Sequence, residues 1–163
     1  MTMAHLITFE QLKEILAELH DCPIDLDEAQ FDRAQREWRG FFLRPVCESP
    51  SAVHRYWGFI AGESRCPVAE GKLVIRGVAE VRRFDDQGIG TYTLNRVQSV
   101  PGGLHISFNE LLRLEIVLDG PIDATYEERL LPGHTAVYRM VLGAETGPKI
   151  VIDPAAPSRL TSG

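Results

Sequence analysis

The stretch LHISFNELLRLEIVL, residues 104–118, decides the fold because it alternates between apolar and polar side chains in two successive runs. In the first run Leu104, Ile106 and Phe108 fall on one face, and the second run repeats the alternation. A period of two is typical of a β-strand with one buried face. Only a few residues separate the runs, which is too short for a helical crossover, so the two strands are predicted to be antiparallel neighbours.

The sequence on both sides of this stretch continues as short strands joined by turn residues. Further strands are expected at 72–84, 89–100, 122–128 and 135–143, with a short edge strand at 149–153. Turns are expected at DDQG (85–88), PGG (101–103) and DGP (119–121), because Gly, Pro and Asp favour them. The alternation in 72–84 predicts four buried side chains, those of Leu73, Ile75, Ala79 and Val81.

Parallel strands would need connections of a dozen or more residues. Such connections are missing from this pattern, so the predicted fold class is α+β and mainly β. We expect a curved antiparallel sheet or partial barrel of about six to eight strands, with an N-terminal helix packed on it.

The helix is expected at residues 8–20, TFEQLKEILAELH. Thr8 followed three residues later by Gln11 is the pattern of a capping box. Pro23 predicts the end of the helix. Its apolar residues recur at helical spacing and predict one buried face: Phe9, Leu12, Ile15, Leu16 and Leu19.

Residues 24–44 fit two structures. As a helix, they would carry aromatic and small apolar residues at helical spacing from Phe31 to Phe41. As a hairpin, DRAQ at 32–35 would be the turn before a return strand rich in aromatics. Gly40 and Pro45 interrupt a long helix, so the hairpin is favoured.

The length of 163 residues predicts one globular domain over 1–152, followed by a flexible tail rich in Pro, Ser and Gly over 153–163. Residues 45–71 show no regular period and are expected to form an irregular connection. Apolar runs stay far below the ~20 residues that a membrane-spanning helix needs. The first residues, MTMAHLITFEQ, lack the pattern of a secretory signal.

The three cysteines, Cys22, Cys47 and Cys66, have spacings that match neither a disulfide framework nor a CxxC motif. Reduced thiols in a cytoplasm are the simplest interpretation. The alternative is one disulfide and one free thiol.

The net charge of −6, from 17 basic and 23 acidic residues, argues against a nucleic-acid partner held by bulk electrostatics. Of the basic residues, only Lys13, Lys72 and Lys149 are lysine. Such a preference for arginine is typical of a GC-rich genome. Separately, stretches such as FDRAQREWRGFFLRP resemble small bacterial proteins, which favours a bacterial source.

The stretch LHDCPIDLDEAQFD, residues 19–32, is dense in side chains that bind metals. A calcium-binding loop starting at Asp25 would require different residues at positions 5, 6 and 12, where Ala29, Gln30 and Arg36 stand. A zinc site lacks paired ligands at the usual spacing. We therefore expect no metal and no cofactor.

A catalytic alternative involves His54, His105 and Ser107. His105 and Ser107 would share one strand face, roughly 6.5–7 Å apart along the strand. Ser107 has no G-x-S-x-G elbow around it, and a solvent-facing polar row accounts for the same residues. This alternative would be a small-molecule-binding or hydrolytic β-barrel with a polar site near these three residues.

Arginine and aromatic residues interleave between positions 33 and 57, where the local charge is 5 − 2 = +3. Such residues are enriched at protein interfaces. Alternatively, both tryptophans belong to the core and the arginines lie over them. The predicted binding surface comprises Arg36, Trp38, Arg39, Arg44, Arg55 and Trp57.

The sequence lacks a complete catalytic pattern. It therefore favours a non-enzymatic, cytoplasmic, bacterial protein that binds another protein or a second copy of itself.

Overall fold

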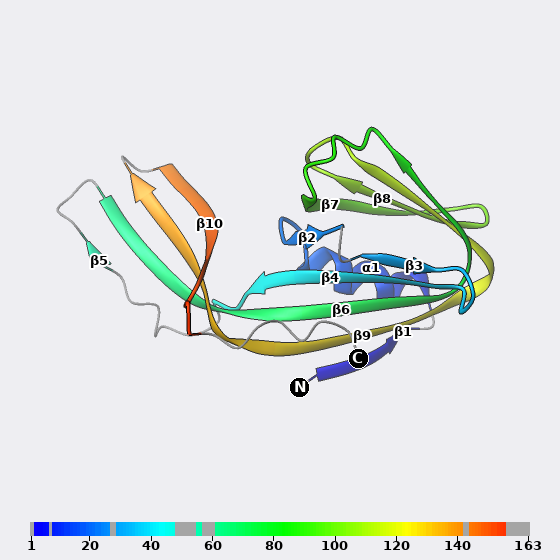
Figure 1. The fold of residues 1–163 in the computed structure, drawn as a ribbon, viewed down its shortest axis with the longest axis horizontal. Coiled ribbons are helices and arrows are strands. Elements are labelled where there is room, and N and C mark those ends of the chain that lie inside the picture. The colour runs from blue at the N-terminus through cyan, green and yellow to red at the C-terminus, as the bar shows by residue number, and fades with distance from the viewer. Residues whose placement is uncertain are drawn as a thin grey trace. The chain divides into compact units, whose positions relative to one another are not determined.

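The computed structural model describes residues 2–6, 8–26, 29–47, 55–56, 61–141 and 144–155. Within these ranges it contains one helix and ten strands, and the assigned strand pairs are antiparallel (Figure 1). The elements are β1 (Thr2–Leu6), α1 (Phe9–Glu18), β2 (Pro23–Asp25), β3 (Gln30–Asp32), β4 (Glu37–Pro45), β5 (Arg55–Tyr56), β6 (Ala61–Phe84), β7 (Thr91–Val100), β8 (Gly103–Phe108), β9 (Arg113–Val141) and β10 (Ala144–Ile152).

Backbone contacts divide the chain into two compact units. Unit 1 comprises Met1–Arg44 and Glu70–Arg129, and unit 2 comprises Pro45–Ala69 and Leu130–Gly163. A single domain over 1–152 with a flexible tail stays a prediction, and residues 156–163 lie outside the described residues. No helix in the described part of the chain is long and apolar enough to cross a membrane.

Unit 1 is a closed antiparallel barrel. Its six strands follow the order β9-β8-β7-β2-β4-β6, and β6 pairs back with β9. β1 extends this sheet by pairing with β9, from Thr2 opposite Glu128 to Leu6 opposite Ala124. The predicted fold class, a mainly β antiparallel structure with an N-terminal helix packed on it, is confirmed.

The stretch 104–118 forms the barrel wall as its alternation predicts. Leu104 lies opposite Ile116 and Ile106 lies opposite Leu114, so apolar residues of β8 and β9 share the inner face. All four side chains are buried. The cross-strand pairs of apolar side chains stabilise the sheet and direct its other face to solvent.

The helix α1 is also confirmed. The Thr8 hydroxyl accepts a hydrogen bond from the Gln11 N–H, and the Gln11 side chain accepts one from the Thr8 N–H, which completes the capping box. Leu12 and Leu16 bury the apolar face. The helix ends at Glu18, ahead of Pro23.

Residues 24–44 contain a hairpin rather than a helix. β3 pairs with β4, from Gln30 opposite Arg39 to Asp32 opposite Glu37. The Asp32 carboxylate accepts hydrogen bonds from the N–H groups of the following turn. The side chain of Trp38 therefore points into the barrel, where its exposed fraction is 2%.

Two predicted interruptions are wrong. β6 begins at Ala61, so much of the segment expected to be irregular is strand. β9 runs without a break through DGP at 119–121. It pairs with β8 up to Val117 and with β1 from Ala124, so the turn residues lie where the strand changes partner and leave the strand continuous.

One predicted core position is also wrong. Ala79 is exposed and the neighbouring Val78 is buried instead. Gly77 has a φ of 69°, a left-handed conformation that only glycine adopts without strain. This conformation changes the alternation of side chains, as it does in a β-bulge.

Unit 2 contains the ends of the two long strands and their short partners. Arg55 of β5 lies opposite Glu63 of β6, and β10 pairs with β9 from Ala144 opposite Val141 to Ile152 opposite His134. The Val46 N–H donates to the Pro67 carbonyl oxygen, which joins the segment after β4 to β6.

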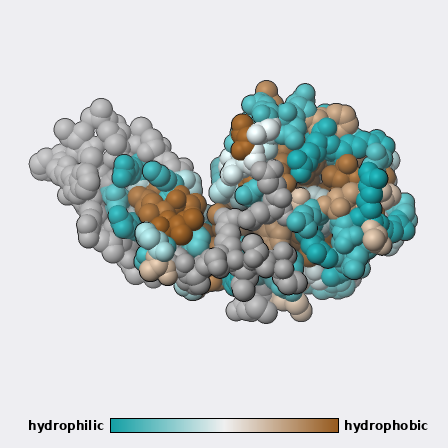
Figure 2. Space-filling model, in the orientation of Figure 1, coloured by the Kyte–Doolittle hydropathy of each residue, from teal (hydrophilic) through white to brown (hydrophobic). Residues whose placement is uncertain are grey.

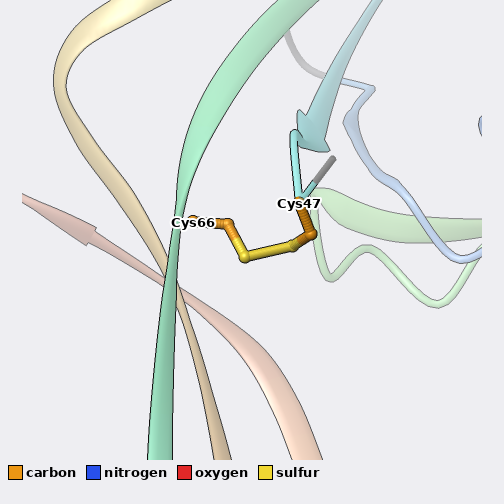
Figure 3. The surroundings of a disulfide bond; sticks show 2 residues. All are labelled: Cys47 and Cys66. Atoms are coloured by element: carbon orange, nitrogen blue, oxygen red, sulfur yellow. A yellow bond between two sulfur atoms is a disulfide. The ribbon is translucent and has the colours of Figure 1, made fainter. Parts of the chain in front are cut away.

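A disulfide bond joins Cys47 to Cys66 of β6, with 5.2 Å between their Cα atoms (Figure 3). The expectation that all three thiols are reduced is therefore wrong, and the alternative of one disulfide with one free thiol holds. Cys22 is the free cysteine and is buried. Sequence spacing could not reveal the pairing, since it depends on the fold bringing the two Cα atoms within disulfide reach.

Candidate functional site

The predicted arginine–aromatic surface is distributed over both units. Trp38 is a core residue of unit 1, which was the alternative interpretation of the tryptophans. Arg55 lies in β5 of unit 2. Trp57 lies outside the described residues.

The remaining arginines of that surface are held by acidic residues of the same chain. Arg36 forms an ion pair with Asp119, Arg39 pairs with Glu37 at 2.9 Å, and Arg44 pairs with Glu128. Arg76 also contacts Glu37, at 3.2 Å. Ion pairs within the chain reduce the attraction that these arginines can offer to an acidic partner.

The Arg44–Glu128 pair belongs to a partly buried polar cluster in unit 1. Arg44 Nε donates to Glu128 Oε2 at 2.9 Å, and the Tyr126 hydroxyl donates to the same oxygen at 2.8 Å. The hydrogen bond from Arg44 lowers the pKa of Glu128, and that from Tyr126 lowers it further. The same pairing raises the pKa of Arg44.

The two potential nucleophiles in this cluster stay protonated at neutral pH. Burial raises the pKa of Cys22 to about 11. Burial, followed by the hydrogen bond to Glu128, also raises the pKa of Tyr126. Because a thiol or phenol attacks as its anion, this cluster is suited to holding the barrel together rather than to nucleophilic catalysis.

The catalytic alternative is only partly assembled. His105 Nε2 lies 3.4 Å from Glu115 Oε1, and Arg113 lies 3.4 Å from the same oxygen. Ser107 follows two residues along β8, and within the described part of the chain no hydrogen bond joins it to His105. His54 lies outside the described residues.

The stretch 19–32 forms the end of α1 and the start of the sheet. His20 Nδ1 contacts the Asp21 carboxylate at 2.9 Å, and Asn109 donates to Asp21 at 3.0 Å. Among the described residues, no group of three or more His, Cys, Asp or Glu side chains could hold a metal ion.

Large apolar side chains fill the barrel interior. The fully buried ones include Tyr92, Phe42, Leu73, Ile75, Leu94, Leu104 and Ile106. Filling by side chains is usual in small barrels. A ligand inside the barrel would have to displace these groups.

Unit 2 contains an open groove of about 560 Å³. His134 is buried there, and its Nδ1 lies 3.2 Å from the carbonyl oxygen of Pro132. The groove is lined by two short segments of β6 and β9, which comprise Arg65, Cys66, Pro67, Val68, Leu130, Leu131, Pro132, Gly133, His134 and Thr135.

Exposed apolar side chains occur in this groove and on the strand that pairs with its lining. Leu130 is 62% exposed on β9, and Val151 and Ile152 are 45% and 55% exposed on β10. Val151 and Ile152 lie opposite two residues of the groove lining, Thr135 and His134. Figure 2 shows a cluster of apolar side chains in the region of β9 and β10. We refer to Leu130, Val151, Ile152 and the groove lining as the apolar surface of unit 2.

The sequence predicted a binding surface within 33–57 and did not predict the apolar surface of unit 2. A signal was available, because the segment 149–153 was expected to be an edge strand. An edge strand rich in β-branched residues is prone to pairing.

Comparison with known proteins identifies no match, whether among protein-family models, curated proteins or solved structures.

Proposed function

We propose that the protein is a non-enzymatic binding protein that associates with another protein or with a second copy of itself. The apolar surface of unit 2 is its binding site. The observation that carries this proposal is the exposure of Leu130 in the groove lining, together with that of Val151 and Ile152 on β10, the strand that pairs with part of that lining. Exposed apolar patches on proteins commonly mark interaction sites.

The ionisable groups of unit 1 support a non-catalytic role. The buried thiol of Cys22 and the buried phenol of Tyr126 have raised pKa values and stay neutral. The carboxylate of Glu128 is held by Arg44. Covalent catalysis usually requires a nucleophile beside an available base. These groups of unit 1 do not form such a pair.

The disulfide indicates the redox state of the cellular compartment in which the protein acts. A cytoplasmic location was expected on the basis of reduced thiols, but Cys47 and Cys66 are bonded. Cytosolic thiols are kept reduced, whereas disulfides persist in oxidising compartments. We therefore propose that the protein acts in an oxidising compartment.

Replacing Leu130 with glutamate tests the binding site. Leu130→Glu places a charge on the apolar surface of unit 2 and is expected to weaken association at least tenfold, which corresponds to about 1.4 kcal/mol. Leu111→Glu is the matched control, since Leu111 is 72% exposed in unit 1. Sedimentation velocity over a concentration series measures self-association, and parallel capture from the native host measures binding to another protein.

The proposal predicts that Leu111→Glu behaves as the wild type in both measurements. Two negative results together would overturn the proposed function. The wild type would show no self-association, and it would capture no protein that is lost with Leu130→Glu.

A further inference from the structure

β10 is an open edge of the sheet in unit 2. Among the residues that the structure describes, it pairs only with β9. The Asp153 N–H donates to the Gly133 carbonyl oxygen at 2.8 Å, in the same register as Val151 opposite Thr135. Hydrogen-bonded positions alternate along an antiparallel strand. The N–H and C=O groups of Ile150 and Ile152 therefore face away from β9.

Side chains at the end of this edge are exposed to solvent. Val151 and Ile152 are about half exposed, and Lys149 and Asp153 are exposed charged groups. Within the described part of the chain neither charge forms an ion pair, in contrast to the paired arginines on β4. The unpaired N–H and C=O groups and half-exposed apolar side chains of this edge are a template for another strand. The charges at its two ends oppose pairing with most strands and favour a strand of complementary charge.

The segment KIVID, residues 149–153, is complementary to itself when reversed. Its centre is Val151, with an isoleucine on each side and opposite charges at the two ends. We propose that a second copy of the chain binds this edge by antiparallel pairing of β10 with β10, with Val151 on the twofold axis. This inference rests on the proposed function and names its partner.

The proposed register places each side chain of the segment opposite one of matching charge or apolar character. Lys149 lies opposite Asp153 of the second copy, and the symmetry repeats this ion pair at the other end. Ile150 lies opposite Ile152 of the second copy, and the two Val151 side chains face each other. A twofold interface uses the same patch on both subunits, so a self-complementary segment is what it requires.

The proposed register also provides hydrogen-bond partners for the outward-facing N–H and C=O groups of β10. Ile150 and Ile152 of the second copy would exchange N–H···O=C hydrogen bonds, and the symmetry doubles them. Pro148 and Pro154 bound the segment and have no N–H to contribute. Centring the pairing one residue to either side would place an isoleucine opposite a proline, which has no N–H to donate to the isoleucine carbonyl oxygen. It would also separate Lys149 from Asp153 of the second copy.

Cysteine cross-linking tests the register directly. In the proposed dimer the two Val151 residues form a non-hydrogen-bonded pair, with Cα atoms about 4.5 Å apart. This separation lies within disulfide range. Val151→Cys should therefore cross-link into dimers under mild oxidation. Ile150→Cys and Ile152→Cys are the controls, because each would face an isoleucine of the second copy.

Charge reversal provides a second test. Lys149→Asp or Asp153→Lys alone would place like charges opposite each other twice, and each is expected to weaken the dimer at least ~tenfold. The double variant K149D/D153K swaps both charges and should restore the wild-type affinity. Sedimentation velocity measures the dimer, and thermal unfolding confirms that each variant remains folded.

The possible failures are distinguishable. A wild type that stays monomeric, with no Val151→Cys cross-link, overturns the dimer. The proposed function still stands if native-host capture recovers a protein that Leu130→Glu loses. A dimer that forms but is indifferent to charge reversal and equally cross-linked at 150, 151 and 152 overturns the β10 register and leaves self-association intact.

Discussion

Glu128 lies in a partly buried polar cluster of unit 1. Its carboxylate accepts hydrogen bonds from both Arg44 and Tyr126, beside the buried thiol of Cys22. Partners of this kind favour the ionised form, which explains why the pKa of Glu128 is lowered in the folded protein. The consequence is a pH-dependent contribution to stability.

Glu128→Gln is expected to lower the free energy of unfolding by about 2 kcal/mol at pH 7, since hydrogen bonds to charged groups contribute roughly 1.5–3 kcal/mol each. In the wild type the pKa of Glu128 in the folded protein lies below its ordinary value. The contribution of Glu128 is therefore complete above that value and is lost as the pH falls through the folded pKa. Urea unfolding between pH 3 and 7 measures both effects.

Glu127→Gln is the matched control for this prediction. Among the described residues Glu127 forms no ion pair, so its replacement should leave the free energy of unfolding and its pH dependence near the wild type. Equal losses from the two substitutions would show that the Arg44–Glu128 pair has no special role.

Close approach of two strands limits which residues β8 can carry. A Cβ atom at Gly103 would lie 2.1 Å from the carbonyl oxygen of Ile116 in β9. Backbone atoms cannot move aside without separating the strands, whereas a Cβ at Gly120 meets nothing within 4 Å. The two glycines are therefore expected to differ in their tolerance of a side chain.

Gly103→Ala is expected to lower the free energy of unfolding by about 1–3 kcal/mol, the usual cost of overpacking. Gly120→Ala should change it by less than about 0.5 kcal/mol. Chemical denaturation of both variants measures the difference. Similar values for the two would mean that β8 and β9 separate easily at this point.

The sequence predicted elements well where the period was clear. The run 104–118 and the helix at 8–20 were recognisable because their burial follows a strict period of two or 3.6 residues. The DGP turn at 119–121 was wrong because a change of strand partner leaves no local signal. Ala79 was misplaced because one left-handed glycine changes the alternation.

The candidate site was harder to predict than the fold. The composition of the arginine-rich segment predicted a binding surface. In the structure Trp38 is buried, Arg39 pairs with Glu37 on the same strand, and Arg36 and Arg44 pair with acids distant in the sequence. Pairings of this kind depend on the tertiary structure. The edge strand at 149–153 was visible in the sequence, yet its openness is a property of the assembled sheet.

The two compact units of the chain differ in what stabilises them. Unit 1 contains a contiguous apolar core. Among the described residues, unit 2 has far fewer buried side chains, and it contains the disulfide. A small core alone stabilises weakly, and a covalent cross-link compensates by restricting the unfolded chain. The stability of unit 2 should therefore depend on Cys47 and Cys66.

Replacing both cysteines by serine is expected to destabilise unit 2 by about 3 kcal/mol, given a sequence separation of 19 residues. Hydrogen exchange followed by mass spectrometry should show faster exchange of amides in 61–69 and 130–141. Amides of β8 should change little. Cys22→Ser, in the core of unit 1, is the control and should show the reverse pattern.

The pairing of β1 with residues 124–128 of β9 has a consequence for the order of folding during synthesis. Among the described strands, β1 pairs only with β9, so this pairing must wait until residue 128 has left the ribosome. At about 5–20 residues per second, the delay is several seconds. Closure of the barrel likewise needs β9, which pairs with β6 and β8. Until then the nascent chain carries unpaired strand edges. Correct folding during synthesis therefore requires that the incomplete sheet does not pair with neighbouring chains. A chaperone that shields the nascent strands would raise the yield of folded protein.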